Sequence, residues 1–148
     1  MSLRLRLIVP ITLGAGLMLS ACSDPEPTAA EAGQVLINHI KQTMDNVRAV
    51  DVEVTDPGGR DIACGNGKYK RTYAVRASSG VGSGNPETVI LMLVSALKGA
   101  GDYKLINTDV NAATQEAVNA QSHTRITVSS PAEGKITAQG ETDCLPSR

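Results

Sequence analysis

The spacing of the apolar residues changes abruptly near Val47, and this change limits the class of fold that the chain can adopt. Over residues 29–47 the apolar residues recur at steps of three and four, which predicts an amphipathic helix. Val50, Val52 and Val54 then alternate with polar residues, which predicts a strand with one buried face. A helix followed at once by a half-buried strand favours an α+β fold.

Later segments repeat this order of helix and strands. Asn85 and Pro86, a capping residue and a proline at the first helical position, predict the start of a second helix that ends near Gly99. Because residues 88–97 are almost entirely apolar, we expect this helix to be the more buried of the two. The Ala/Asn/Gln-rich segment 109–122 is expected to form a loop or a short helix. Further strands are expected at 62–64, 68–77, 102–108, 124–128 and 135–140.

These elements predict a two-layer sandwich, an antiparallel sheet of four or five strands with two helices on one face. Its core has to be aliphatic, because the chain contains three tyrosines and no phenylalanine or tryptophan. The other face of the sheet is expected to be partly wet and to carry Lys68, Lys70 and Arg76. Arg71 shares the inward phase of its strand, so we expect it near the rim of the core.

The N-terminal segment combines a basic start with a short apolar run. Arg4 and Arg6 precede residues 7–19, which would be about 20 Å long as a helix, against about 30 Å for the hydrocarbon core of a bilayer. This length suits a secretory signal. The alternative is a transmembrane or buried helix with an incidental cysteine, and Pro10 and Gly14 weaken it further.

The apolar run ends in residues 19–22, Leu-Ser-Ala-Cys. In this order of charge, apolar run, small residues and cysteine, the N-terminus resembles bacterial lipoproteins, in which this signal directs a diacylglyceryl group onto the cysteine thiol. The resemblance implies that residues 1–21 are a signal peptide and that Cys22 becomes the lipidated mature N-terminus. Two acyl chains suffice for stable attachment, so it also implies a lipid anchor in the cell membrane, on the extracytoplasmic face.

The rest of the chain divides into a tether and one domain. Residues 22–31 begin with an acidic, proline-containing stretch that favours an extended spacer, and 32–148 are expected to form a single α+β domain. In its layout and its cysteine pair, this part resembles the small α+β lipoproteins of actinobacteria, most of which have no known function. The resemblance leaves open which membrane of a two-membrane cell holds the anchor.

Cys64 and Cys144 remain as an even pair once Cys22 carries lipid. In an exported, oxidising setting such a pair is expected to form a disulfide, here between the first hairpin region and the end of the chain. A metal site is the alternative, but it would need two more ligands, and only His39 and His123 are available, each isolated in sequence. We therefore expect a disulfide, with no metal and no cofactor.

The sequence offers little for catalysis. His39 and His123 are the only histidines, no Gly-x-Ser-x-Gly motif is present, and we expect both to be surface residues. The glycine-rich stretch 80–84 is not followed by the Lys-Ser/Thr of a phosphate-binding loop and is expected to be a linker. Four carboxylates lack the spacing of a calcium loop and are expected at a solvated strand edge and turn, namely Asp51, Glu53, Asp56 and Asp61.

Charge argues against a nucleic-acid partner. The formal net charge is −1, and loss of Arg4 and Arg6 with the signal would make it −3. A weakly acidic domain without basic stripes or stacking aromatic residues is a poor nucleic-acid binder.

The sequence therefore favours a membrane-tethered, non-enzymatic envelope lipoprotein that acts as a binding or assembly module. Its partner would be an envelope protein, a glycan or a lipid, received on an exposed sheet face or in a groove. The alternative is a lipid or glycolipid carrier whose helices and sheet part around an aliphatic cavity, because such a chain would have the same apolar pattern. A cell-wall hydrolase is the least favoured, since the catalytic motifs are missing.

Overall fold

The computed structural model describes residues 25–81, 84–107, 109 and 112–147. The signal peptide predicted at 1–21 and the lipidation site Cys22 lie outside the described residues. In chain order the elements are α1 (Ala29–Asn46), β1 (Val50–Asp56), β2 (Ile62–Gly65), β3 (Lys68–Lys70), β4 (Thr72–Ser78), α2 (Pro86–Ala100), β5 (Lys104–Leu105), β6 (Thr114–Asn119), β7 (Thr124–Ser129), β8 (Lys135–Thr142) and β9 (Leu145–Pro146).

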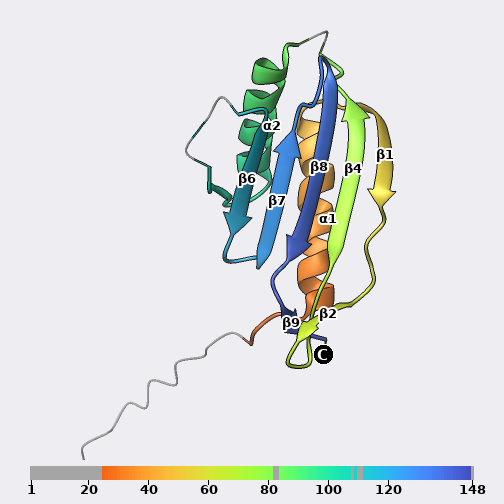
Figure 1. The fold of residues 1–148 in the computed structure, drawn as a ribbon, viewed down its shortest axis with the longest axis vertical. Helices are drawn as coiled ribbons and strands as arrows, with labels where there is room; N and C mark the ends of the chain where they lie inside the picture. The colour runs from red at the N-terminus through yellow and green to blue at the C-terminus, as the bar shows by residue number, and fades with distance from the viewer. Residues whose placement is uncertain (1–24, 82–83, 108, 110–111, 148) are drawn as a thin grey trace, which may run out of the picture.

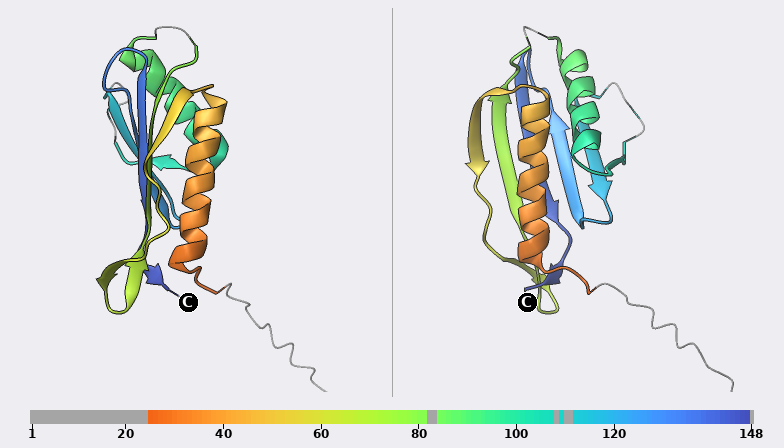
Figure 2. Two further views of the ribbon diagram at one scale, coloured as in Figure 1. Left: turned by 90° about the vertical axis from the view of Figure 1, so that its right-hand side faces the viewer. Right: turned by 180° about the vertical axis from the view of Figure 1, so that it is seen from behind.

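Six strands form one antiparallel sheet in the order β1-β4-β8-β7-β6-β5, and both helices lie on one of its faces (Figures 1 and 2). Helix α1 packs on β4 and β8, α2 packs on β6 and β7, and the two helices contact each other. This is the predicted α+β sandwich, with one strand more than the upper expectation. A small second sheet, β2-β3-β9, extends from one end of the molecule (Figure 1).

The core between the two layers is aliphatic, as the composition requires. Its largest fully buried apolar side chains come from both helices and from the central strands, and each is at most 1% exposed: Leu36, Ile40, Ile90, Leu93, Leu97, Ile126, Val128 and Ile136. Tyr73 and Tyr103 are the two tyrosines in this core. The third, Tyr69, packs instead against a satellite cluster of Ala29, Ala32 and Leu145.

Helix α1 begins with a complete capping box. The backbone N–H of Glu31 donates to Thr28 Oγ1 at 3.2 Å, and the backbone N–H of Thr28 donates to Glu31 Oε2 at 2.8 Å. The Thr28 hydroxyl also donates to Glu31 Oε2, at 2.9 Å, and the two bonds that the carboxylate accepts from Thr28 favour its charged form and lower the pKa of Glu31. Ala29 is fully buried, so the folded domain starts inside the segment 22–31 that the sequence assigned to the tether.

Helix α2 begins where the sequence predicts. Asn85 Oδ1 accepts a hydrogen bond from the backbone N–H of Thr88 at 2.9 Å, and Pro86 is the first helical residue. The expectation that α2 is the more buried helix is wrong, because five of its 15 residues are buried against seven of 18 in α1, and Leu91 of α2 is 58% exposed. Apolar residues surround this helix, but only one side of it meets the sheet and α1. Among the described residues, no helix is both long and apolar enough to span a membrane.

The prediction of a loop or short helix at 109–122 is wrong, because strand β6 lies within this segment. It pairs with β7 along its whole length. The inward positions carry no apolar signal apart from Ala117, since the other two are the amides Gln115 and Asn119. These amides bond to neighbouring turns: Gln115 Nε2 donates to the carbonyl of Asp109 at 2.7 Å, and Asn119 Oδ1 accepts from backbone N–H groups of the next turn.

The prediction that β1 has one buried face is also wrong. Val50, Val52 and Val54 are 47%, 48% and 47% exposed. Strand β1 is at the edge of the sheet, and α1 lies beside it, over β4 and β8, so no helix covers its apolar side (Figure 2). The alternation correctly identified the strand but did not reveal its position in the sheet.

Two predicted strands are shorter than expected. Arg71 divides the strand predicted at 68–77 into β3 and β4, and it turns its side chain toward the first helix, where a Cβ on Gly33 would lie 2.7 Å from its Cδ. The strand predicted at 102–108 is reduced to Lys104–Leu105.

Candidate functional site

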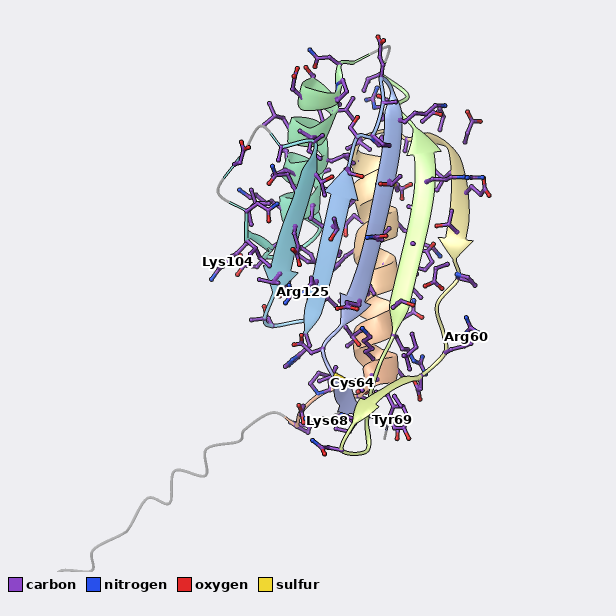
Figure 3. All side chains as sticks on the ribbon, viewed as in Figure 1. Arg60, Cys64, Lys68, Tyr69, Lys104 and Arg125 are labelled. Carbon is purple, nitrogen blue, oxygen red and sulfur yellow. A yellow bond between two sulfur atoms is a disulfide. The ribbon has the colours of Figure 1, made fainter. Side chains whose placement is uncertain are left out.

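The face of the six-stranded sheet that the helices leave uncovered is polar and open to solvent (Figure 3). The pairing register aligns alternate residues of four strands on it, so that Ala74, Gln139, Thr127 and Glu116 form one row. Thr137 and Ser129 lie in one neighbouring row and Glu141 and Arg125 in the other, so hydroxyl, amide and charged side chains are mixed on this face. This face is the wet side that the sequence predicted.

A shallow depression of about 400 Å³ crosses this face. Arg125 forms one of its walls, and its Nη1 lies 2.6 Å from Glu116 Oε1. This hydrogen bond and charge, with the more distant Glu141 and Asp143, raise the pKa of Arg125. The depression therefore offers one firmly charged guanidinium among carboxylates, surrounded by hydroxyl and amide groups. The other lining residues are Asp56, Thr72, Tyr73, Ala74, Thr127, Gln139 and Gly140.

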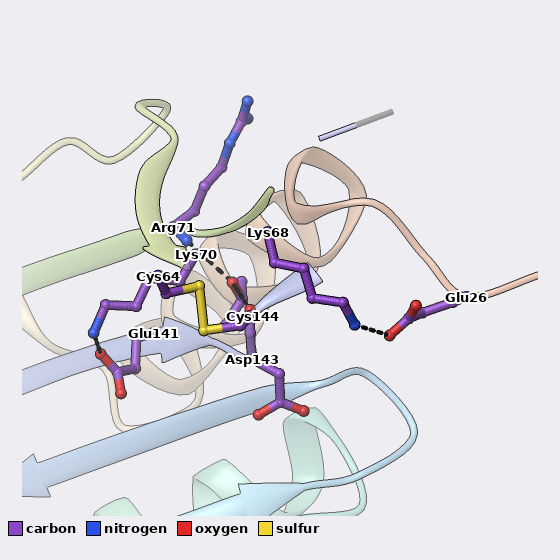
Figure 4. Close-up of a disulfide and its surroundings, with 9 residues drawn as sticks. Glu26, Cys64, Lys68, Lys70, Arg71, Glu141, Asp143 and Cys144 are labelled. Atoms are coloured by element: carbon purple, nitrogen blue, oxygen red, sulfur yellow. Dashed lines mark hydrogen bonds and ion pairs between the residues drawn. A yellow bond between two sulfur atoms is a disulfide. The ribbon is translucent and has the colours of Figure 1, made fainter. Parts of the chain in front are cut away.

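A second depression continues the first toward the disulfide, since Glu116, Arg125 and Glu141 line both. In it Lys70 Nζ lies 2.7 Å from Glu141 Oε2 (Figure 4). Lys70 thus points to the wet face, as predicted. Arg76 does so too, because its Nη2 lies 2.8 Å from Glu53 Oε2.

The predicted disulfide is present, and it joins Cys64 of β2 to Cys144 just before β9, 80 positions apart (Figure 4). The turn between β2 and β3 is formed by Asn66 and Gly67, both in the left-handed region with φ of 53° and 69°. Strand β3 also pairs with β9. The disulfide and these pairings hold the hairpin and the end of the chain together.

The segment before α1 reaches the same end of the molecule. Glu26 Oε1 lies 3.2 Å from Lys68 Nζ of β3 (Figure 4). Both side chains are roughly half exposed, so this pair contributes little stability by itself. It does show that the chain enters the domain beside the β2–β3 hairpin.

The expectation that His39 is a surface residue is wrong. The side chain is half buried between α1 and the chain after α2, with Nδ1 at 3.0 Å from Tyr103 Oη. Burial lowers the pKa of His39. Tyr103 Oη lies 2.8 Å from Thr124 Oγ1, and Ser122 Oγ lies 2.8 Å from the same atom. The nearby serine thus reaches Thr124 and not the imidazole, so these groups do not form a serine–histidine pair.

His123 lies in the turn between β6 and β7, just before β7 begins. Its Nδ1 is 3.2 Å from Asp143 Oδ2, and its backbone has a φ of 54°. The histidines are not close to the disulfide in a ligand arrangement: within the described part of the chain, no group of three or more His, Cys, Asp or Glu side chains is placed to hold a metal ion.

The four carboxylates near β1 are distributed along a strand edge and the following turn, as expected. Glu53 pairs with Arg76. Asp61 Oδ1 lies 2.7 Å from Arg71 Nε. Asp56 accepts hydrogen bonds from Thr72 Oγ1 at 2.6 Å and from a backbone N–H of the turn, which lower its pKa.

An apolar groove that the sequence did not predict separates β1 from α1. It has a volume of about 230 Å³ and is lined by Lys41, Met44, Asp45, Val52, Val54, Tyr73 and Val75. The valines were expected inside the core, so nothing in the sequence distinguished a groove from a buried strand.

The fold and these surfaces define a small two-layer α+β domain with an open polar sheet face. Comparison with protein-family models, with curated proteins and with solved structures finds no match to this chain. The functional assignment depends on the chain's own residues.

Proposed function

We propose that this protein is a membrane-anchored envelope lipoprotein whose domain acts as a non-enzymatic binding or assembly module at the extracytoplasmic face. The observation that carries the proposal is the order of the N-terminal residues: a basic start, an apolar run over 7–19, and Leu-Ser-Ala ahead of Cys22. Lipidation of Cys22 would provide two acyl chains, enough for stable attachment without a spanning helix.

The position of the domain's first contacts supports this proposal. Glu26 already contacts Lys68 of β3, so four residue steps separate it from Cys22. At about 3.5 Å per step, a lipidated Cys22 would lie within about 14 Å of Glu26. The β2–β3 hairpin would then be the end near the bilayer, and the open sheet face would extend away from it, accessible to a partner.

A binding role fits the chemistry of the described side chains better than catalysis does. His39 Nδ1 is occupied by Tyr103, and the neighbouring Ser122 contacts Thr124 instead. Glu31 and Asp56 have lowered pKa values, which is the opposite of what a general acid needs. The open sheet face instead offers hydroxyl, amide and charged groups that can hydrogen-bond to a protein or a glycan.

We do not extend the proposal to a lipid carrier. The helices and sheet meet through side chains such as Leu36, Leu93 and Ile126, each 0% exposed, so they are closely packed there. The depressions described above open on the outer surface. Mass spectrometry of the natively purified protein checks this point, and lipid other than the covalent anchor retained in the folded domain would favour the carrier instead.

The test of the anchor compares the full chain with Cys22→Ser and with Ser23→Ala in a bacterial host that processes lipoproteins. The full chain and Ser23→Ala are expected in the membrane fraction, with the mass of a diacylglyceryl group on the residue-22 peptide. Cys22→Ser is expected to be absent from the membrane fraction and to carry no diacylglyceryl group. Normal processing and membrane retention of Cys22→Ser would overturn the proposal.

A further inference from the structure

The two edges of the six-stranded sheet differ. One edge is β5, which has only two residues, and the other is β1, which has seven. Among the described residues β1 pairs with β4 alone, so its outer side presents backbone N–H and C=O groups to solvent. An open edge of this kind is a template for another strand.

The side of β1 that faces the helices is apolar and only half covered. Val52 and Val54 are 48% and 47% exposed, and they line the groove beside α1. Met44 and Tyr73, both nearly buried, form its floor. The groove can therefore receive a small apolar side chain from a strand laid along β1.

The opposite side of β1 is acidic. Asp51 and Glu53 line one depression of the open sheet face, together with Arg76 and Lys135 of the neighbouring chain segments, and Asp56 lines another. The strand carries three carboxylates and no basic residue. Arg76 pairs with Glu53, the charge of Arg60 contributes to the lowered pKa of Asp56, and Lys135 donates a hydrogen bond to Ser78. Asp51 is the carboxylate of β1 that has no ion pair or hydrogen bond to a described side chain.

We propose that the β1 edge binds an extended peptide of alternating apolar and basic residues, which adds to the sheet as a further strand. In an added strand, side chains alternate between the two faces. Its apolar residues would lie over Val52 and Val54, and its basic residues would lie beside Asp51 and Glu53. Irregular pairing between Val50 and Glu53, where Asp51 has a φ of 53°, and between Val54 and Asp56 limits the regular edge to Glu53 and Val54, so only a short part of the peptide is expected to pair with the backbone of β1.

A second copy of this chain does not fit the same edge. If two β1 strands paired edge to edge, the sheets would be continuous, and Asp51, Glu53 and Asp56 of both copies would lie on one face. Like charges on paired strands are destabilising. The charge of β1 therefore selects a basic partner and opposes self-association.

The probes for this proposal are three capped octapeptides. The first alternates valine with lysine, the second alternates valine with glutamate, and the third contains the residues of the first in blocks of two. We expect the full chain, purified in detergent, to bind the first peptide at least about tenfold more tightly than either of the others at low salt. Equal affinity for the alternating and blocked lysine peptides, or no binding of the alternating lysine peptide, would overturn the proposal.

Variants locate the binding. Val52→Thr with Val54→Thr removes apolar contact without breaking the strand. This variant is expected to bind the alternating valine–lysine peptide about tenfold more weakly than the wild type does. Leu91→Thr is the matched control, because Leu91 is 58% exposed on α2, away from the edge, and affinity should not change. Asp51→Lys with Glu53→Lys should reverse the preference toward the valine–glutamate peptide. An unchanged preference in this charge-reversed variant, or dimerisation of the wild type in place of peptide binding, would contradict the assignment.

Discussion

His39 on α1 and Tyr103, just after α2, are joined by a contact of 3.0 Å between Nδ1 and Oη. Their rings also meet edge to face, with centroids 5.5 Å apart. Tyr103 also contacts Thr124 of β7 at 2.8 Å, so a series of polar contacts connects α1, the segment after α2 and the sheet. Gly101 allows this close approach, because a Cβ there would lie 3.0 Å from His39 Cε1.

The burial of His39 makes the stability of the domain depend on pH. Burial lowers the pKa of His39 below its ordinary value of 6.5, so the unfolded chain binds the proton more tightly than the folded one. The free energy of unfolding is therefore expected to be highest above pH 6.5 and to fall as the pH drops through the lowered pKa. Denaturant unfolding between pH 5 and pH 8 measures this.

The contribution of His39 is isolated by substitution. His39→Asn is expected to unfold more easily at pH 8 than the wild type but to show a flatter pH dependence. His123→Asn leaves the His39–Tyr103 contact in place. This variant should therefore still show the decrease in the free energy of unfolding at low pH that is due to His39. A pH dependence that is the same in His39→Asn and in the wild type would refute this explanation.

The disulfide is expected to provide a large part of the domain's stability. Cys64 and Cys144 close a loop of 80 positions, worth on the order of 4 kcal/mol in the chain-entropy model. Cys64→Ser with Cys144→Ser should therefore lower Tm by roughly 10 °C or more. Reduction of the wild type should have a similar effect, whereas Cys22→Ser should leave Tm unchanged. A shift of only a degree or two on reduction would show that the bond is unimportant for folding.

The sequence predicted the elements that have a clean local signal. The first helix was predicted from its apolar stripe and the second from its cap at Asn85 and its apolar composition. Both begin at the residue after a side-chain cap, which is Thr28 for α1 and Asn85 for α2. The even cysteine pair likewise predicted the bond between Cys64 and Cys144. These features depend on neighbouring residues or on simple counting, so one sequence is enough to find them.

Prediction from the sequence failed where the position of a residue in the tertiary structure determines whether it is buried and which residues it contacts. Gln115 and Asn119 are buried in β6 because turns bond their amides, and this replaces the apolar alternation on which strand prediction depends. The valines of β1 alternate as in a buried strand, but the sheet order places β1 at the edge. The Arg125–Glu116 pair on the open sheet face was missed for the same reason, since the pairing of β6 with β7 creates it.

Two arginines in similar ion pairs are expected to contribute differently. The Arg71 side chain is 22% exposed, packs against Gly33 and lies 2.7 Å from Asp61, whereas Arg125 is 46% exposed. Arg71→Ala should lower the free energy of unfolding by about 1–2 kcal/mol, because it loses packing as well as charge. Arg125→Ala should cost less than about 1 kcal/mol.

Arg71→Met separates packing from charge at the first site. The thioether side chain keeps most of the apolar stem, so Arg71→Met should lower the free energy of unfolding by about half as much as Arg71→Ala does. Equal losses in Arg71→Ala and Arg125→Ala would mean that burial does not distinguish the two pairs. Chemical denaturation of the three variants under one buffer condition provides the comparison.

Gly140 in β8 sets how closely α1 approaches the sheet. A Cβ at this position would lie 2.6 Å from Leu36 Cδ1 and 2.7 Å from the backbone carbonyl oxygen of Arg125. That carbonyl belongs to β7, the strand paired with β8, and cannot shift without disturbing the sheet. Gly140→Ala should therefore lower the free energy of unfolding by about 1–3 kcal/mol through overpacking.

Gly99→Ala is the matched control for this substitution. Gly99 lies in α2, where the nearest atom to an added Cβ is Asn46 Nδ2 at 3.8 Å, so the methyl group fits. Alanine favours helix over glycine by up to about 1 kcal/mol, so this variant should be as stable as the wild type or more so. If Gly140→Ala lowers the free energy of unfolding and Gly99→Ala does not, the spacing between α1 and the sheet is what excludes a larger side chain at Gly140. A Gly140→Ala protein as stable as Gly99→Ala would mean that α1 can move away from the sheet at little cost.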